Sequence, residues 1–480
     1  MRVSESGLGR IVLAGLAVAL LAAASSATAG ATTSIRKAWL SSYAAPGTPE
    51  SLNKVGVIKI GSSRAKNVLV IEPGTSGGGA YFVPLAKWLN ERAPGWQVWA
   101  VERRENRLER QGELDKFKKG EVTAAQLFRY YLGYLAESSD PEPHYLPVSE
   151  SKATADGART WGMNVAVQDL HTVIGAAKEL GGKVVLAGHS LGGTVVTAYA
   201  TWDFAGKPGA EGLSGLVYID GGSSPAAIST GEAEAALEKE SKKSPWLAFG
   251  GVRAPLLGLF SMTGSALANL APNEASQAGA FPLLPSFLRP HNKEGKEVTA
   301  TNEATFGYGV NVGSSPPNLA AAQVHAGEGI MESGPGEPWT WNGAGALTPL
   351  QRYAEMLSGA GLKGVDGSEW YFPERLTIDS GAVGNGIANP AQAVLGEDAI
   401  HGTELPTTLH ILAINSELDN LFGGGFTTLT FAEDLAKQSS IPSANVTLVD
   451  VSSSYAHNDP NSAYPTNEFV SHLVPFLEGL

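Results

Sequence analysis

The sequence contains no cysteine among its 480 residues. Disulfide bonds and thiolate-bound metal ions are therefore excluded, and the folded state must be stabilised by its buried core. The sequence also lacks an H-E-x-x-H motif, an EF-hand loop and a phosphate-binding loop with its lysine. We therefore predict that the protein needs neither a metal ion nor another cofactor.

Basic residues are scarce relative to acidic ones. Lysine and arginine together number 34 against 47 acidic residues, which gives a formal net charge of −13. A chain with this excess of negative charge repels phosphate backbones, so nucleic acid is not an expected partner. Hydrophobic residues make up 43% of the chain, which is enough for an ample core, and the length alone would suggest two or three structural units.

Long apolar runs are also rare, and the main one lies near the beginning of the chain. It spans 14 residues, 11–24, and follows Arg2 and Arg10. A helix needs about 20 apolar residues to cross a bilayer, so this run is too short for an anchor. The sequence A-T-A at 27–29 then offers a cleavage site with small residues. We therefore predict a signal peptide over 1–29, a secreted or periplasmic location and no stable membrane anchor.

Segments of strand and helix character alternate in two parts of the chain. Strands are predicted at 55–60, 67–72, 96–101, 184–187, 215–220, 408–414 and 446–451, and helices at 82–92, 124–135, 163–180, 194–201, 428–437 and 467–477. This alternation predicts an α/β fold with a mostly parallel central sheet and helices on both faces. Residues 223–404, rich in Gly, Pro, Ala and Ser, interrupt the pattern with mainly helical signals. We therefore divide the chain after the signal peptide into a core, 30–222 and 405–480, and a large helical insertion, 223–404.

A G-x-S-x-G motif follows directly on the apolar strand at 184–187. It reads G-H-S-L-G at 188–192 and continues into a helix-compatible segment. A strand can turn this sharply into a helix only where small residues flank the serine, whose hydroxyl is then exposed above the sheet. The sequence G-T-S-G-G at 74–78 also matches the motif, but no helix begins directly after it. We therefore predict Ser190, rather than Ser76, as a nucleophile.

A serine nucleophile needs a base within hydrogen-bond reach, and the base needs a carboxylate to orient it. On an α/β core of this kind the three groups occur in the order Ser, acid, His, each after a strand. His457 follows the strand at 446–451 and is the predicted base. His472 falls in the terminal helix, and His189, next to the serine, is expected to point away from it.

Three residues are candidates for the carboxylate. Asp419 follows the strand at 408–414 and is the first candidate. Asp220, at the end of the strand at 215–220, and Glu417 remain open as alternatives. Some proteins built on such a core carry the acid at the position of Asp220, although a turn residue before two glycines is an equally ordinary reading.

Attack of a serine on a carbonyl creates an oxyanion, which needs prealigned N–H donors. We expect one donor in the backbone N–H of Leu191, at the start of the helix after the serine. The other is expected in the glycine-rich loop 73–79, whose lack of side chains lets the backbone approach a substrate. Thr75 is the first candidate in this loop and Ser76 the next.

These motifs resemble the α/β-hydrolase superfamily, especially its lipase- and esterase-like branch, in which G-H-S-x-G-G is frequent. The resemblance covers about 55–222 and 405–480. One departure is that Pro73-Gly74 stands where a His-Gly pair is usual at the oxyanion loop. The resemblance implies an α/β-hydrolase fold and a lid or cap formed by the insertion.

The residues together predict an exported serine hydrolase that cleaves carboxylic esters, either small-molecule or lipid esters, through an acyl-enzyme. A secreted peptidase of aminopeptidase type and an acyltransferase would use the same residues, and a binding protein could keep the fold without turnover. Apolar residues at 247–271 and aromatic residues at 339–341 and 370–372 form either a packed lid core or an acyl-chain pocket. The sequence does not indicate an oligomeric state.

Overall fold

The computed structural model describes residues 33–480 except 138, 140–142, 149–151, 225, 250 and 418–426. The predicted signal peptide, 1–29, and the candidate acid Asp419 both lie outside the described residues. No helix in the described part combines the length and the apolar character needed to cross a membrane.

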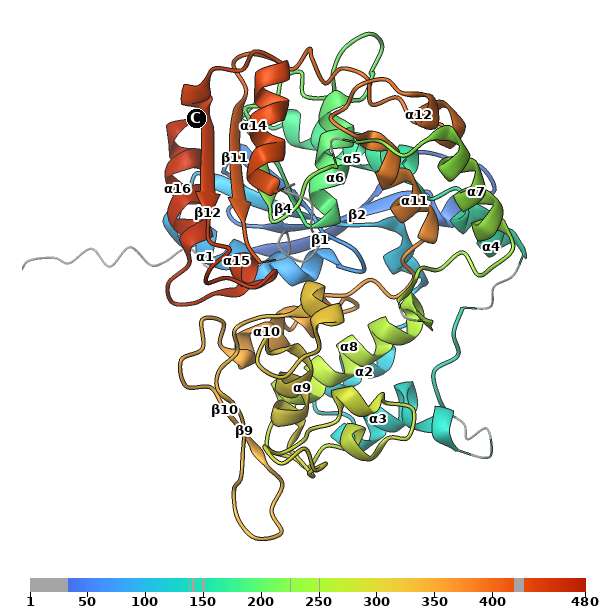
Figure 1. Cartoon of the computed structure of the whole chain (residues 1–480), viewed down its shortest axis with the longest axis vertical. Coiled ribbons are helices and arrows are strands. Elements are labelled where there is room, and N and C mark those ends of the chain that lie inside the picture. Colours follow the sequence, from blue (N-terminus) through green and yellow to red (C-terminus); the bar gives the residue numbers. More distant parts are fainter. Residues whose placement is uncertain are drawn as a thin grey trace, which may run out of the picture. The chain divides into compact units, whose positions relative to one another are not determined.

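An eight-stranded sheet forms the centre of the fold (Figure 1), in the order β1-β2-β4-β3-β5-β6-β11-β12. Its strands are β1 (Ile35–Ser41), β2 (Lys54–Ile60), β3 (Asn67–Glu72), β4 (Trp96–Glu102), β5 (Val184–His189), β6 (Gly215–Ile219), β11 (His410–Asn415) and β12 (Val446–Asp450). The pairs β1–β2 and β2–β4 are antiparallel, and the other pairs are parallel. The prediction of an α/β fold with a mostly parallel central sheet flanked by helices is confirmed.

Helices cover both faces of the sheet, because the central strands are apolar on both sides. In β3, Leu69 and Ile71 pack on one face, and Val68 and Val70 pack on the other. The first face is covered by α1 (Val83–Arg92) and α16 (Glu468–Gly479), and the second by α5 (Met163–Lys178), α6 (Leu191–Thr201) and α14 (Thr428–Gln438). Short helices α4 (Lys152–Ala158) and α15 (Asp459–Ser462) complete this part.

Sequence analysis located seven of the eight strands and missed β1. This strand lies at the edge of the sheet, and its side chains are half-buried or exposed without a regular alternation. Its pairing is defined instead by the partner strand, with Ile35 opposite Ile60 and Ser41 opposite Lys54. A strand whose position is set by pairing with its neighbour shows little hydrophobic periodicity in its own sequence.

The insertion adds no strand to the eight-stranded sheet within its described residues. Its helices are α7 (Thr230–Ser241), α8 (Ala254–Leu270), α9 (Asn302–Val310), α10 (Leu350–Leu357), α11 (Glu374–Val383) and α12 (Pro390–Leu395), and its strand pairs are β7 (Ala248–Phe249) with β8 (Val252–Arg253) and β9 (Gly329–Met331) with β10 (Thr340–Asn342). The helix α8 packs with α2 (Gly112–Lys118) and α3 (Ala124–Tyr131) around one apolar cluster. Trp370 and Tyr371 are fully buried in this cluster, so these two aromatic residues fill a packed core.

Candidate active site

Ser190 lies in the sharp turn between β5 and α6. Its backbone has φ 57° and ψ −129°, a conformation that residues with a side chain rarely adopt. A methyl group at Gly188 would collide with the carbonyl of Gly192, and one at Gly192 would collide with the carbonyl of Glu72. The turn is therefore as tight as the motif predicts. The Ser190 side chain makes no capping hydrogen bond to α6, which leaves its hydroxyl available.

A buried histidine–carboxylate pair lies beside this turn. Nδ1 of His457 and Oδ2 of Asp220 are 2.6 Å apart, and the two side chains are 2% and 0% exposed. Ser416 holds the same carboxylate, because its backbone N–H donates to Oδ1 at 2.7 Å and its hydroxyl donates to Oδ2. Burial alone would raise the pKa of Asp220, but the hydrogen bonds from His457 and Ser416 outweigh it and lower that pKa below its ordinary value. The pair therefore consists of an ionised carboxylate and an imidazole oriented by it.

The order of the candidate acids changes with this geometry. Asp220, an alternative in the sequence analysis, forms the hydrogen bond with Nδ1 of His457. The first candidate, Asp419, lies outside the described residues. The remaining candidate, Glu417, donates its backbone N–H to the carbonyl of Tyr455 at 2.9 Å. The two glycines after Asp220 are a signal that sequence reasoning undervalued. A side chain at Gly221 would collide with the backbone of Ser190, so this glycine lets the acid turn lie against the serine turn.

His189, the residue before Ser190, contacts the candidate base His457. The rings of His189 and His457 are stacked with centroids 4.4 Å apart, and Nε2 of His189 lies 3.1 Å from the carbonyl oxygen of His457. The ring of Tyr81 also stacks on that of His189, with centroids 5.8 Å apart. Burial, with the neighbouring His457 as the second cause, lowers the pKa of His189 to about 3. The ring is therefore neutral, and Nε2 carries the proton that it donates. Sequence analysis had assigned His189 no role.

Contacts of neighbouring residues link the serine turn to the histidine–carboxylate pair. His189, directly before Ser190, stacks on the ring of His457, and Gly221, directly after Asp220, packs against the backbone of Ser190. Within the described residues, no hydrogen bond joins Ser190 Oγ to the ring of His457. Such bonds are often long in the absence of substrate and tighten when it binds.

The predicted oxyanion loop lies next to the serine. A methyl group at Gly74 would lie 2.7 Å from Cβ of Ser190 and 3.3 Å from its Oγ, so only glycine allows this approach. Thr75, the predicted donor, follows directly. The other predicted donor, Leu191, is the first residue of α6, where backbone N–H groups and the helix dipole favour a negative charge.

Backbone strain concentrates at this site. In the described part of the chain, six residues other than glycine have a positive φ. Three of them are Ser76 in the oxyanion loop, Ser190 in the serine turn and Asp220 in the acid turn. Such conformations persist only where the surrounding structure holds them, and they cluster at functional sites.

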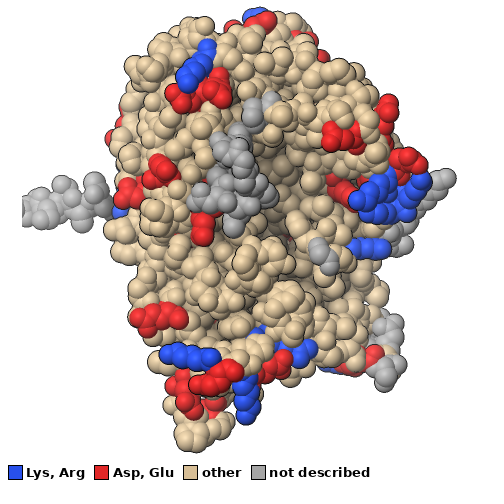
Figure 2. Space-filling model, in the orientation of Figure 1, with Lys and Arg blue, Asp and Glu red and all other residues tan. Residues whose placement is uncertain are grey.

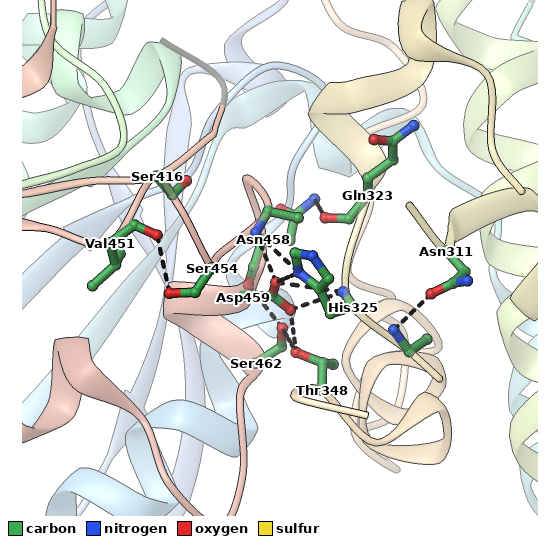
Figure 3. A network of polar contacts seen from close by, with 12 residues as sticks. Asn311, Gln323, His325, Thr348, Ser416, Val451, Ser454, Asn458, Asp459 and Ser462 are labelled. Carbon is green, nitrogen blue, oxygen red and sulfur yellow. Dashed lines mark hydrogen bonds and ion pairs between the residues drawn. The ribbon is translucent and has the colours of Figure 1, made fainter. Parts of the chain in front are cut away.

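Hydrogen bonds join the loop that carries His457 to the insertion (Figure 3). Nδ1 of His325, from the insertion, lies 2.6 Å from Oδ2 of Asp459. The same carboxylate accepts the backbone N–H of Ala456 at 2.8 Å and the hydroxyl of Thr348 at 2.6 Å. The hydrogen bond to Asp459 raises the pKa of His325, and Glu417 adds a smaller effect in the same direction. The insertion thus contacts the loop that carries His457 through the carboxylate of Asp459, which also holds the backbone of Ala456.

The surface and the metal-binding potential add two observations. Figure 2 shows acidic and basic side chains in small groups on one face, with a hollow near the middle of that face. Among the residues that the structure describes, no group of three or more His, Cys, Asp or Glu side chains could hold a metal ion.

No family model and no curated protein matches the sequence. A solved structure from Sulfolobus solfataricus, described provisionally as a lipase, is 14% identical, with 93% of this chain and 94% of that chain covered and a TM-score of 0.47. A monoglyceride lipase from Saccharomyces cerevisiae, solved with a substrate analogue, is 11% identical, with 94% and 95% covered and a TM-score of 0.37. A carboxyl esterase from Bacillus coagulans, solved with glycerol, is 11% identical, with 93% and 99% covered and a TM-score of 0.39.

Proposed function

We propose that this protein is a serine hydrolase that cleaves carboxylic esters through a covalent acyl-enzyme. The observation that carries the proposal is the buried pair of His457 and Asp220, 2.6 Å apart, beside Ser190 in its strained turn. A serine hydroxyl becomes a nucleophile at neutral pH when an oriented imidazole can accept its proton. We assign the acid to Asp220.

In the acylation step, Oγ of Ser190 attacks the ester carbonyl while Nε2 of His457 accepts the hydroxyl proton. The electron pair of the carbonyl moves to its oxygen, and Asp220 stabilises the imidazolium through Nδ1. When the tetrahedral intermediate collapses, the bond to the alkoxy oxygen breaks. His457 then gives its proton to the departing alcohol, and the acyl group remains on Ser190.

Deacylation repeats the same steps with water. His457 accepts a proton from water as its oxygen attacks the acyl carbonyl, and returns the proton to Oγ of Ser190 when the carboxylic acid leaves. In both tetrahedral intermediates we place the oxyanion between the N–H of Leu191 and the N–H of Thr75. Leu191 supports this role as the first residue of α6, and Thr75 supports it through the close approach of Gly74 to Ser190.

Labelling with a fluorophosphonate probe tests the nucleophile directly. The probe should label wild-type protein and Ser76→Ala but not Ser190→Ala. Turnover of p-nitrophenyl esters of increasing chain length should fall by ~10⁴-fold or more in Ser190→Ala. Ser76 is the matched control, because it also has a positive φ and lies in the second G-x-S-x-G match. Labelling of Ser190→Ala at the wild-type rate would overturn the proposal.

Comparison of ester chain lengths addresses the substrate class. Faster turnover of long-chain than short-chain esters would assign the protein to lipid esters, and equal rates would assign it to small esters. Hydrolysis of aminoacyl anilides in preference to esters would contradict both.

We also propose that the protein is exported, on the evidence of its first 29 residues alone. The basic start, the short apolar run and the A-T-A sequence at 27–29 support cleavage before Gly30. Mass spectrometry of protein recovered outside the cytoplasm should find a chain that begins at Gly30. Recovery of a chain that still begins at Met1 would contradict cleavage.

A further inference from the structure

Arg103 lies directly after β4 and is buried, with 5% of its side chain exposed. Its guanidinium donates to two carboxylates, Oε1 of Glu72 at 2.8 Å and Oε2 of Glu369 at 2.8 Å. It also donates to two backbone carbonyls, that of Gly74 at 3.1 Å and that of Pro73. A single buried cation therefore joins the end of β3, the start of the oxyanion loop and the insertion.

These contacts determine which way the loop's N–H groups point. The peptide bond between Gly74 and Thr75 is planar and trans, so its C=O and N–H point in opposite directions. Since the carbonyl of Gly74 points at Arg103, the N–H of Thr75 points away from it. The bond from Arg103 to the carbonyl of Pro73 orients the preceding peptide in the same way. Arg103 thus orients, from behind, the groups that would face an oxyanion.

The insertion holds the same loop from a second direction. The backbone N–H of Glu369 donates to the carbonyl of Ser76 at 2.8 Å, and the N–H of Gly78 donates to the carbonyl of Gly367 at 3.0 Å. Gly77 and Ser368 form an isolated antiparallel bridge between these bonds. The positive φ of Ser76 is therefore held by backbone pairing with the insertion.

The charges around Arg103 make this arrangement sensitive to single substitutions. Glu369 is completely buried, and its Oε1 has no hydrogen-bond partner among the described residues. Glu72 is 2% exposed. Removing one partner of a buried ion pair leaves the other charge uncompensated in a medium of low dielectric constant, which is strongly destabilising. Around Arg103, the group whose charge would be left uncompensated is the one that orients the loop.

We propose that Arg103 and Glu369 are positioning residues of the oxyanion loop, so that residues 367–369 of the insertion are a fixed part of the catalytic machinery. This inference rests on the proposed function, because it assigns a role to the loop in stabilising the tetrahedral intermediate. It also means that any opening of the insertion must leave this segment in place.

The neighbouring arginine provides a matched control. Arg104 is 1% exposed and pairs with Asp169 through two hydrogen bonds, Nη2 to Oδ1 at 2.6 Å and Nε to Oδ2 at 2.8 Å. Its other partners are the carbonyl of Tyr43 and the side chain of Asn53, so it does not touch the oxyanion loop. Arg103→Lys and Arg104→Lys therefore each remove a guanidinium that pairs with buried carboxylates at a buried site.

The test compares kcat, KM and the inhibition constant of an alkyl boronic acid, whose tetrahedral adduct places an oxygen among the oxyanion donors. Removal of one oxyanion donor costs about 10²–10³-fold in kcat, so a misoriented donor should cost about 10- to 100-fold. We expect this loss in Arg103→Lys, with KM within about twofold and a matching rise in the inhibition constant. Arg104→Lys should lower the melting temperature and leave kcat and inhibition at wild-type values.

A second variant keeps the test decisive if Arg103→Lys fails to fold. Glu369→Gln keeps an oxygen acceptor for Arg103 and removes only the charge, so kcat should fall by several-fold while KM is retained. Equal kcat in the Arg103 and Arg104 variants, or an unchanged inhibition constant in Arg103→Lys, would overturn the inference while wild-type turnover still supports the hydrolase. Absence of fluorophosphonate labelling in the wild type would instead overturn the proposed function, and the inference with it.

Discussion

His189 and His457 lie face to face, with ring centroids 4.4 Å apart and a hydrogen bond from Nε2 of the first to the carbonyl of the second. The residue next to the proposed nucleophile therefore holds the backbone of the proposed base. The stack tolerates a charged His457, because burial keeps the pKa of His189 at about 3 and its ring neutral.

Two substitutions at His189 should separate stacking from hydrogen bonding. His189→Phe keeps a ring but loses the bond, and one hydrogen bond is worth ~0.5–1.5 kcal/mol, so kcat should fall by about 2- to 12-fold. His189→Ala loses both contacts and should be slower still, with KM little changed in each case. The pH profile of kcat should keep its shape around neutral pH, because the pKa of His189 is only about 3. If a His189 variant changed the pH at which kcat falls on the acidic side of the profile, His189 itself would exchange a proton during turnover.

The identity of the acid can be tested with a pair of isosteric substitutions. Asp220→Asn should reduce kcat by ~10⁴-fold, because an amide no longer stabilises the imidazolium or selects the correct tautomer. Asp419→Asn should retain nearly wild-type turnover. Measuring kcat/KM and the rate of fluorophosphonate labelling for both variants decides between the two residues. A large loss in Asp419→Asn with an active Asp220→Asn would reverse our assignment.

Substitution by alanine should distinguish Gly74, which lies against Ser190, from Gly175, which has no close neighbour. Gly74→Ala would place Cβ 2.7 Å from Cβ of Ser190, so we expect ester turnover to be largely lost. Gly175→Ala, in α5, meets no atom within 4 Å and should stabilise the helix by ~0.5–1 kcal/mol. Turnover and thermal unfolding of the two variants provide the comparison. Full activity in Gly74→Ala would show that the loop lies farther from the serine than described.

The pair of His325 and Asp459 predicts a pH-dependent contribution to stability. Because the folded-state pKa of His325 is raised, the stabilisation is complete below the ordinary histidine pKa and is lost as pH rises through the raised value. His325→Gln, which cannot carry the charge, should therefore lower the melting temperature more at pH 5 than at pH 9. His472→Gln, on the exposed side of α16, serves as the control. A melting-temperature difference that does not change with pH would contradict the ion pair.

Local patterns predicted the parts of the site that depend on neighbouring residues in the chain. The glycines around Ser190 imply a sharp turn because steric exclusion acts within five residues. The apolar runs of the central strands imply burial on both faces for the same local reason. Seven strands of the sheet could therefore be located from the sequence, and β1, whose pairing depends on β2, could not.

Contacts between distant segments could not be inferred in this way. Asp220 ends one predicted strand and Asp419 follows another, and only the spatial arrangement of the loops shows that Asp220 reaches His457. The pairing of Arg103 with Glu369 joins residues 266 positions apart, and nothing local to either one marks it. Burial of such charges is decided by the whole fold, which explains why sequence reasoning passed over them.

The position of His457 has a consequence for the timing of protein synthesis. Its loop follows β12, the last strand of the sheet, so a ribosome must translate this strand before the imidazole can meet the serine turn made much earlier. A nascent chain would carry Ser190 without its base. If the chain is also threaded across a membrane before folding, cellular esters would never encounter an assembled enzyme during biogenesis.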